Sequence, residues 1–167
     1  MPAFDDVRVL AFDVFGTVVD WRGTIAREVD ALGLGSAIDG AAFATAWRAR
    51  YQPALKRIRD GERPWTKLDV LHRENLDATL DAFGIGDRLD ETTRRSLNLV
   101  WHRLDPWPEA VAGLTRLKTR FTITPLSNGN VGLLTAMAKR AGLPWDCVLS
   151  AEIFRAYKPQ PAAYLGV

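Results

Sequence analysis

The stretch from Val7 to Asp20 constrains the fold of this chain more than any other. Its first half, Val-Arg-Val-Leu-Ala-Phe, is a nearly continuous apolar run, which is typical of a central parallel strand covered on both faces. Asp13 interrupts the run at its carboxyl end, where open α/β sheets place their ligand sites. Gly16 then allows a sharp turn. The stretch therefore predicts a strand that presents one carboxylate, although aspartate also caps ordinary turns.

Composition limits the classes of function. The 167 residues are 47% hydrophobic, enough for one globular, soluble domain with a substantial core. The 22 basic and 20 acidic residues give a net charge of +2, too small to indicate binding to nucleic acid or to a membrane. Cys147 is the only cysteine, which excludes an intramolecular disulfide and fits a reducing cytoplasm. The acidic start of the chain is unlike a secretion signal, and no apolar run reaches the roughly 20 residues of a membrane span.

From Trp21 to Leu104 the pattern is that of amphipathic helices, with no convincing strand. The first helix should stop near Gly33, and Asp39 should cap a longer second helix, which Pro53 should bend or interrupt. Two more helices are predicted over residues 65–84 and 90–104.

After Pro108 helices and strands alternate. Apolar spacing predicts strands at Phe121–Leu126 and Cys147–Ser150, each preceded by a helix. This order predicts an α/β fold with a parallel, Rossmann-like sheet and a helical cap inserted after the first strand. The predicted core comprises residues 1–20 and 105–167, and the predicted cap comprises residues 21–104.

Three groups of polar residues follow the predicted strands: Asp13, the pair Ser127 and Asn128, and Lys158. Because the carboxyl ends of parallel strands share one edge of a sheet, we expect these residues to converge on one crevice. Taken singly, each has an ordinary explanation, since Ser-Asn-Gly is a common turn and a lysine before proline is usually a solvated surface charge.

Together these residues resemble the first three motifs of the haloacid dehalogenase superfamily, beginning with Asp13-Val-Phe-Gly-Thr-Val-Val-Asp20. The resemblance implies that Asp13 is a nucleophile, and an ammonium such as that of Lys158 would favour and position its charged form. Thr17 would hydrogen-bond the same carboxylate or shape its loop. Ser127 and Asn128 would donate to an anionic substrate group.

Phe15 departs from the phosphatase pattern of that superfamily, in which a second aspartate serves as the general acid. A phosphate ester needs a proton for its leaving alkoxide, whereas a halide needs none. An aromatic residue followed by Gly16 and Thr17 resembles the 2-haloacid dehalogenase branch instead. The resemblance implies no metal and no other cofactor. A phosphatase or phosphonate hydrolase is the main alternative within the superfamily.

The resemblance extends into the predicted cap and to the end of the chain. Trp47-Arg-Ala-Arg-Tyr51 resembles the segment whose arginine receives the halide, which implies that role for Arg48; Arg50 is the rival, and an ordinary surface arginine is the bland alternative. Trp65 would wall an apolar pocket with Phe15, although core packing explains Trp65 about as well. The hydroxyl of Tyr164 would contact Lys158 or Asp13.

The resemblance also implies missing parts. Members of the family continue with at least two further strands and a fourth, acidic motif, so we expect the carboxyl-terminal part of the core to be absent and the first strand to be an edge. Either the chain is a fragment of a longer one, or a partner such as a second copy, in a homodimer, covers that edge. The implied reaction converts short 2-haloalkanoic acids to 2-hydroxy acids through an aspartyl ester, and a truncated, non-catalytic chain is the alternative from another class.

Overall fold

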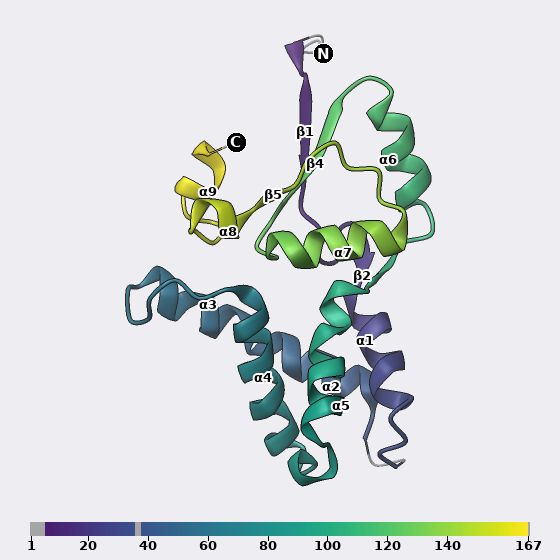
Figure 1. Cartoon of the computed structure of the whole chain (residues 1–167), viewed down its shortest axis with the longest axis vertical. Helices are drawn as coiled ribbons and strands as arrows, with labels where there is room; N and C mark the ends of the chain where they lie inside the picture. Colours follow the sequence, from purple (N-terminus) through teal and green to yellow (C-terminus); the bar gives the residue numbers. More distant parts are fainter. Residues whose placement is uncertain (1–5, 36–37, 167) are drawn as a thin grey trace.

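The computed structural model describes residues 6–35 and 38–166, so residues 1–5, on which the interpretation of the leader rested, lie outside it. Its main sheet is parallel, with the order β1-β4-β5. These strands are β1 Val9–Phe12, β4 Thr122–Ser127 and β5 Leu149–Ser150. The connecting helices are α6 Ala110–Lys118 and α7 Val131–Ala141, at the same end of the molecule as the sheet (Figure 1). The predicted parallel α/β fold is confirmed, with both later strands near their predicted places.

β1 differs from the expected fully covered strand. It pairs only with β4 among the described residues, in the register Val9 to Thr122. Val9 is 47% exposed, and Phe12, on the opposite face, is partly buried against Trp145. One face of β1 lacks a covering layer within the described residues, which is why its apolar run is only half buried. β1 is an edge strand, as expected from the resemblance.

The helical region after β1 is also as predicted. In Figure 1 it forms the opposite end of the molecule from the main sheet. Its α-helices are α1 Trp21–Asp30, α2 Gly40–Ala49, α3 Tyr51–Arg59, α4 Leu68–Ala82 and α5 Glu91–Asn98. Two short 3-10 helices, η2 Gly86–Arg88 and η3 Leu99–His102, flank α5.

Local sequence explains most of the helix boundaries. The side chain of Asp39 accepts a hydrogen bond from Ala41 N and caps α2, as predicted. The predicted long helix is two helices that meet at Arg50, three residues before Pro53, because proline has no N–H to continue the hydrogen-bond ladder. The helix predicted to run to residue 104 is α only as far as Asn98 and continues as η3.

A short antiparallel ribbon joins the two ends of the helical region. β2 Val19–Asp20 pairs with β3 Asp105–Pro106, and Asp20 lies opposite Asp105. The predicted boundaries of the helical region fall at these two positions, but nothing in the sequence predicts that they pair. A two-residue ladder has too few side chains to leave a strand pattern in a sequence. The pairing supports the division into core and cap, which stays a prediction.

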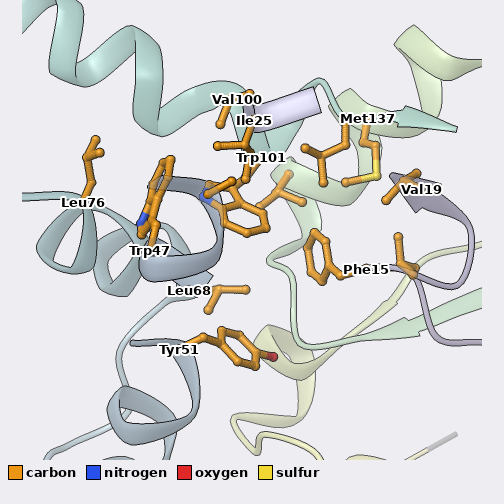
Figure 2. Packing of buried hydrophobic residues seen from close by; sticks show 14 of the residues in the cluster. Phe15, Val19, Ile25, Trp47, Tyr51, Leu68, Leu76, Val100, Trp101 and Met137 are labelled. Atoms are coloured by element: carbon orange, nitrogen blue, oxygen red, sulfur yellow. The ribbon is translucent and has the colours of Figure 1, made fainter. Parts of the chain in front are cut away.

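A continuous hydrophobic cluster passes from the helical region to α7 beside the sheet (Figure 2). The ring of Trp101, from η3, lies at its centre, between Trp47 of α2 and Phe15 of the loop after β1. Two short helices, α8 Ala151–Phe154 and α9 Ala162–Leu165, follow β5. None of the helices in the described ranges combines the length and the apolar character needed to cross a bilayer.

Candidate active site

Asp13 lies directly after β1 and is held at both carboxylate oxygens. Lys158 Nζ donates to Oδ1 at 2.7 Å, and Thr17 Oγ1 donates to Oδ2 at 3.0 Å. The side chain of Lys158 is 18% exposed, whereas that of Asp13 is 49% exposed and remains open to a ligand. The two donors orient an accessible carboxylate, which is the arrangement that a nucleophile requires. Asp13 and Lys158, two of the groups expected to converge, therefore lie together, and Thr17 contacts the same carboxylate.

Asn128 ties three segments together at the end of β4. Its Oδ1 accepts a hydrogen bond from Lys158 N at 2.8 Å, and its Nδ2 donates to the hydroxyl of Tyr51 at 2.8 Å. Ser127 is 1% exposed, and its Oγ accepts from Gly129 N at 3.2 Å. Asn128 thus fixes the backbone of the lysine and links the strand ends to α3.

Arg48 projects from α2 into a group of aromatic rings. Its Cζ lies 3.9 Å from the centroid of the Tyr51 ring and 5.7 Å from that of Phe15. Trp21 and Trp101 are also close, at 5.6 and 5.8 Å. Such contacts stabilise a cation that has been removed from water.

The guanidinium of Arg48 is incompletely hydrogen-bonded. Its Nη1 is buried and has no partner among the described residues. Burial lowers the pKa of Arg48, while Tyr51 and the charge of Asp13 act in the opposite direction. Arginine nevertheless stays protonated in proteins, so this is an unpaired buried donor with a full positive charge in the electrostatic range of Asp13.

Arg50, the rival arginine, has structural partners. Its Nη2 donates to Ala78 O at 3.0 Å and its Nε donates to Thr79 Oγ1 at 3.2 Å, both in α4. It also lines a surface hollow of about 510 Å³ between α2, α3 and α4, which does not include Asp13. These contacts favour Arg48 over Arg50 as the cation of the site.

The other residues predicted to line the substrate pocket, Phe15, Gly16 and Trp65, do not all lie at the same place. Phe15 is 9% exposed and packs against Trp101 in a T-shaped arrangement. Gly16 has φ +94°, and its carbonyl accepts a hydrogen bond from Trp107 Nε1. Trp65 instead packs against Tyr157, with ring centroids 4.5 Å apart. Trp65 and Phe15 therefore pack against different rings, Trp65 against Tyr157 and Phe15 against Trp101.

Tyr164 lies in α9 and is 48% exposed. Within the described part of the chain, the hydrogen-bond donors to Asp13 are Lys158 and Thr17, and the Tyr164 hydroxyl bonds to neither Asp13 nor Lys158. The buried tyrosine of this segment is Tyr157, whose hydroxyl donates to Thr66 O at 2.7 Å. The position of Tyr164 in the motif after Lys158 does not show that its side chain points to solvent.

Sequence reasoning missed the aromatic surroundings of Arg48. The sequence assigns no role in the site to Tyr51, Trp21 or Trp101, although their rings surround the guanidinium. One available signal was the high tryptophan content, six in 167 residues, because tryptophan is a favoured partner of arginine. The described residues contain no group of three or more His, Cys, Asp or Glu suited to a metal ion. The expectation of a metal-independent reaction stays a prediction.

A family model described as haloacid dehalogenase-like hydrolase matches residues 7–167. The chain belongs to this family. It lies in the L-2-haloacid dehalogenase branch, since its relatives there share its fold and a large part of its sequence.

Three of these relatives define the likeness. (S)-2-haloacid dehalogenase 1 of Pseudomonas sp. (strain CBS-3) is 30% identical over 96% of this chain and 69% of its own length. The structure of the defluorinating L-2-haloacid dehalogenase Rha0230 is 49% identical, with a TM-score of 0.92, over 96% of this chain and 66% of that one. The L-2-haloacid dehalogenase of Xanthobacter autotrophicus with covalently bound chloropropionic acid is 26% identical, with a TM-score of 0.81, over 95% of this chain and 62% of that one. This haloacid dehalogenase-like chain thus spans about two thirds of the length of its relatives.

Proposed function

We propose that this protein hydrolyses short 2-haloalkanoic acids to 2-hydroxy acids. The observation that carries the proposal is that one site holds two groups of opposite charge, the carboxylate of Asp13 and the guanidinium of Arg48. Asp13 is held at both oxygens and is open to a ligand, and Arg48 is buried among aromatic rings with an unpaired Nη1. A haloacid offers an electrophilic carbon to the first group and a departing anion to the second.

The first step is an in-line displacement by Asp13. A carboxylate oxygen attacks the carbon that bears the halogen, a carbon–oxygen bond forms, and the carbon–halogen bond breaks with its electron pair leaving on the halide. The halide departs towards Arg48, with the amide of Asn128 as a further donor. Lys158 and Ser127 hold the carboxylates of nucleophile and substrate, and Thr17 keeps Asp13 oriented.

The second step hydrolyses the aspartyl ester. Water attacks the ester carbonyl of Asp13, the bond between that carbonyl carbon and the alkoxy oxygen breaks, and the 2-hydroxy acid leaves with that oxygen. The water supplies the new carboxylate oxygen of Asp13 and the proton of the product hydroxyl, and its second proton passes to solvent. Because this second step leaves the substrate carbon untouched, the inversion caused in the first step by attack opposite the halide is kept in the product.

Two observations support this reaction over alternatives. Phe15 provides no proton for the alkoxide of a phosphate ester, so magnesium-dependent release of phosphate would be the finding that revives a phosphatase or phosphonatase. The relative from Xanthobacter autotrophicus holds chloropropionic acid covalently, as an ester mechanism requires. Rha0230 is described as defluorinating, and we therefore include fluoroacetate with the chlorinated and brominated acids. A non-catalytic chain would release no halide from any of them.

The test is a single turnover in water enriched in heavy oxygen, with enzyme in excess over haloacid. The ester mechanism predicts an unlabelled product hydroxyl and label in the Asp13 peptide, both measured by mass spectrometry. A labelled hydroxyl together with an unlabelled Asp13 would make Asp13 a general base and contradict the mechanism.

Two finer statements belong with this proposal. We place the protein in the cytoplasm, because a chain with one cysteine and so no intramolecular disulfide fits a reducing compartment. We also propose a homodimer, in which a second copy protects exposed apolar surface such as that of β1. Light scattering at several protein concentrations measures the molar mass and so tests for the dimer. A monomer at every concentration would contradict the proposal.

A further inference from the structure

His72 of α4 is a buried titratable residue to which the mechanism above gives no role. It is 1% exposed and stacks on Trp101, with ring centroids 4.2 Å apart and an interplanar angle of 22°. Trp47 and Tyr51 complete its surroundings, with centroids 6.4 and 6.5 Å away. The imidazole therefore belongs to the same group of rings that surrounds Arg48.

The hydrogen bonding of His72 is anomalous for a core residue. Neither Nδ1 nor Nε2 has a partner among the described residues, although both are buried. The bond from Trp47 Nε1 goes to the backbone carbonyl of His72 and leaves its ring unpaired. Buried polar side chains are nearly always satisfied in native proteins. A phenyl ring would stack on Trp101 equally well, so packing alone does not explain a histidine here.

The protonation state of His72 limits what it can bind. Burial, and then the positive charge of Arg48, lower the pKa of His72 to about 3, with His102 acting in the same direction and Asp69 against it. At neutral pH the ring is uncharged, with one N–H donor and one acceptor nitrogen. A neutral donor beside a cation suits an anion that must be solvated and then released.

Two aromatic rings lie between His72 and Arg48 and connect them. Tyr51 and Trp101 each contact both side chains. Arg48 Nη1, His72 Nδ1 and His72 Nε2 account for three of the buried side-chain atoms without a partner in the described part of the chain. Arg48 and His72 are thus neighbouring side chains with N–H groups that have no partner, and the side chains around them are aromatic rather than acidic. Together they form a set of donors for an anion.

We propose that His72 determines halide specificity by donating an N–H to the departing halide beside Arg48. This inference rests on the proposed function. Fluoride is the smallest of the halides and the strongest hydrogen-bond acceptor, so loss of a fixed donor should slow its departure most. Bromide, a better leaving group with a diffuse charge, depends least on that donor.

The test compares His72→Phe, which keeps a ring and removes the nitrogens, with His72→Gln, which keeps an N–H donor. Halide release from fluoroacetate, chloroacetate and bromoacetate is measured for both variants and the parent enzyme. We expect His72→Phe to lose about 10- to 100-fold in kcat for fluoroacetate and under about threefold for bromoacetate, with His72→Gln in between. The unfolding midpoint of His72→Phe should equal or exceed that of the parent, because two unpaired buried nitrogens are gone.

Each contrary pattern overturns the inference. Equal losses for all three acids with a lower midpoint would make His72 a packing residue, and unchanged rates would remove it from the reaction. If the parent released no halide from any of the acids, the proposed function would fail instead. Calorimetric titration with sodium fluoride and sodium chloride then still tests the role of His72. The inference requires the parent to bind these ions more tightly than His72→Phe does. Equal binding, or no binding, refutes it.

Discussion

The two sides of the candidate site are built on opposite principles. On the side of the strand ends, Asp13, Asn128 and Lys158 are connected by short hydrogen bonds. On the side of the helical region, Arg48 and His72 are embedded in aromatic rings and keep unpaired buried nitrogens. The first side is complete before a ligand arrives, and the second side is not.

This difference corresponds to what each side does in the proposed reaction. A nucleophile works best when it is fixed in advance, so its partners belong to the protein. A leaving halide gains its charge only as the bond breaks, and donors that wait unpaired among apolar rings give their full interaction at that moment. The contrast predicts that substitutions on the two sides affect stability and rate in different proportions.

Asp13→Asn should have the largest effect, since it removes the nucleophile and keeps the shape of the side chain. We expect halide release to fall by about 10⁴-fold or more. Asp6→Asn, an exposed carboxylate just before β1, is the matched control and should retain the activity of the parent. Activity of Asp13→Asn within a few-fold of the parent would refute the assignment of the nucleophile.

Arg48→Met should give the next largest effect and separates rate from stability. It should slow halide release by about 10²- to 10³-fold, most for fluoroacetate. Its unfolding midpoint should stay constant or rise, because an apolar residue replaces a buried guanidinium whose Nη1 has no hydrogen-bond partner.

Arg50→Met is the counterpart, two residues along the chain. It loses the bonds to Ala78 O and Thr79 Oγ1, so it should lower the midpoint and leave kcat within a few-fold of the parent. The reverse assignment of rate and stability effects would show that Arg50 is the cation of the site.

How much the sequence predicts differs between the two sides. Asp13, Ser127 and Lys158 follow the ends of recognisable strands, and the geometry of a parallel sheet then requires them to converge. Arg48 was selected through resemblance alone, because a cationic residue on a helix leaves no pattern of its own. Its neighbour Trp101 comes from η3, more than fifty residues away, and only tertiary packing brings the two together. Tyr164 and the pairing of β2 with β3 were beyond sequence reasoning for the same reason.

Asp69 at the start of α4 connects the two sides. Its Oδ2 accepts from Asn130 Nδ2 at 2.5 Å, and its backbone N–H donates to Asn130 Oδ1 at 3.2 Å, just before α7. Its Oδ1 lies 3.0 Å from His102 Nε2 in η3. Burial alone would raise the pKa of Asp69, but the hydrogen bond and charge of His102, with the hydrogen bond of Asn130, outweigh it and hold the pKa below the ordinary aspartate value.

Asp69→Asn should have the smallest effect and tests whether this connection depends on charge. A lowered pKa means that the ionised carboxylate stabilises the fold above the ordinary aspartate pKa and ceases to do so as the pH falls through the native value. We expect the variant to lose about 1 to 2 kcal/mol of unfolding free energy at pH 7 and to approach the parent as the pH falls below the ordinary aspartate pKa. Urea unfolding at several pH values measures this, with Asp81→Asn on the exposed face of α4 as the control. A difference that did not change with pH would mean that shape rather than charge matters at Asp69. The two sides would then be joined by neutral packing.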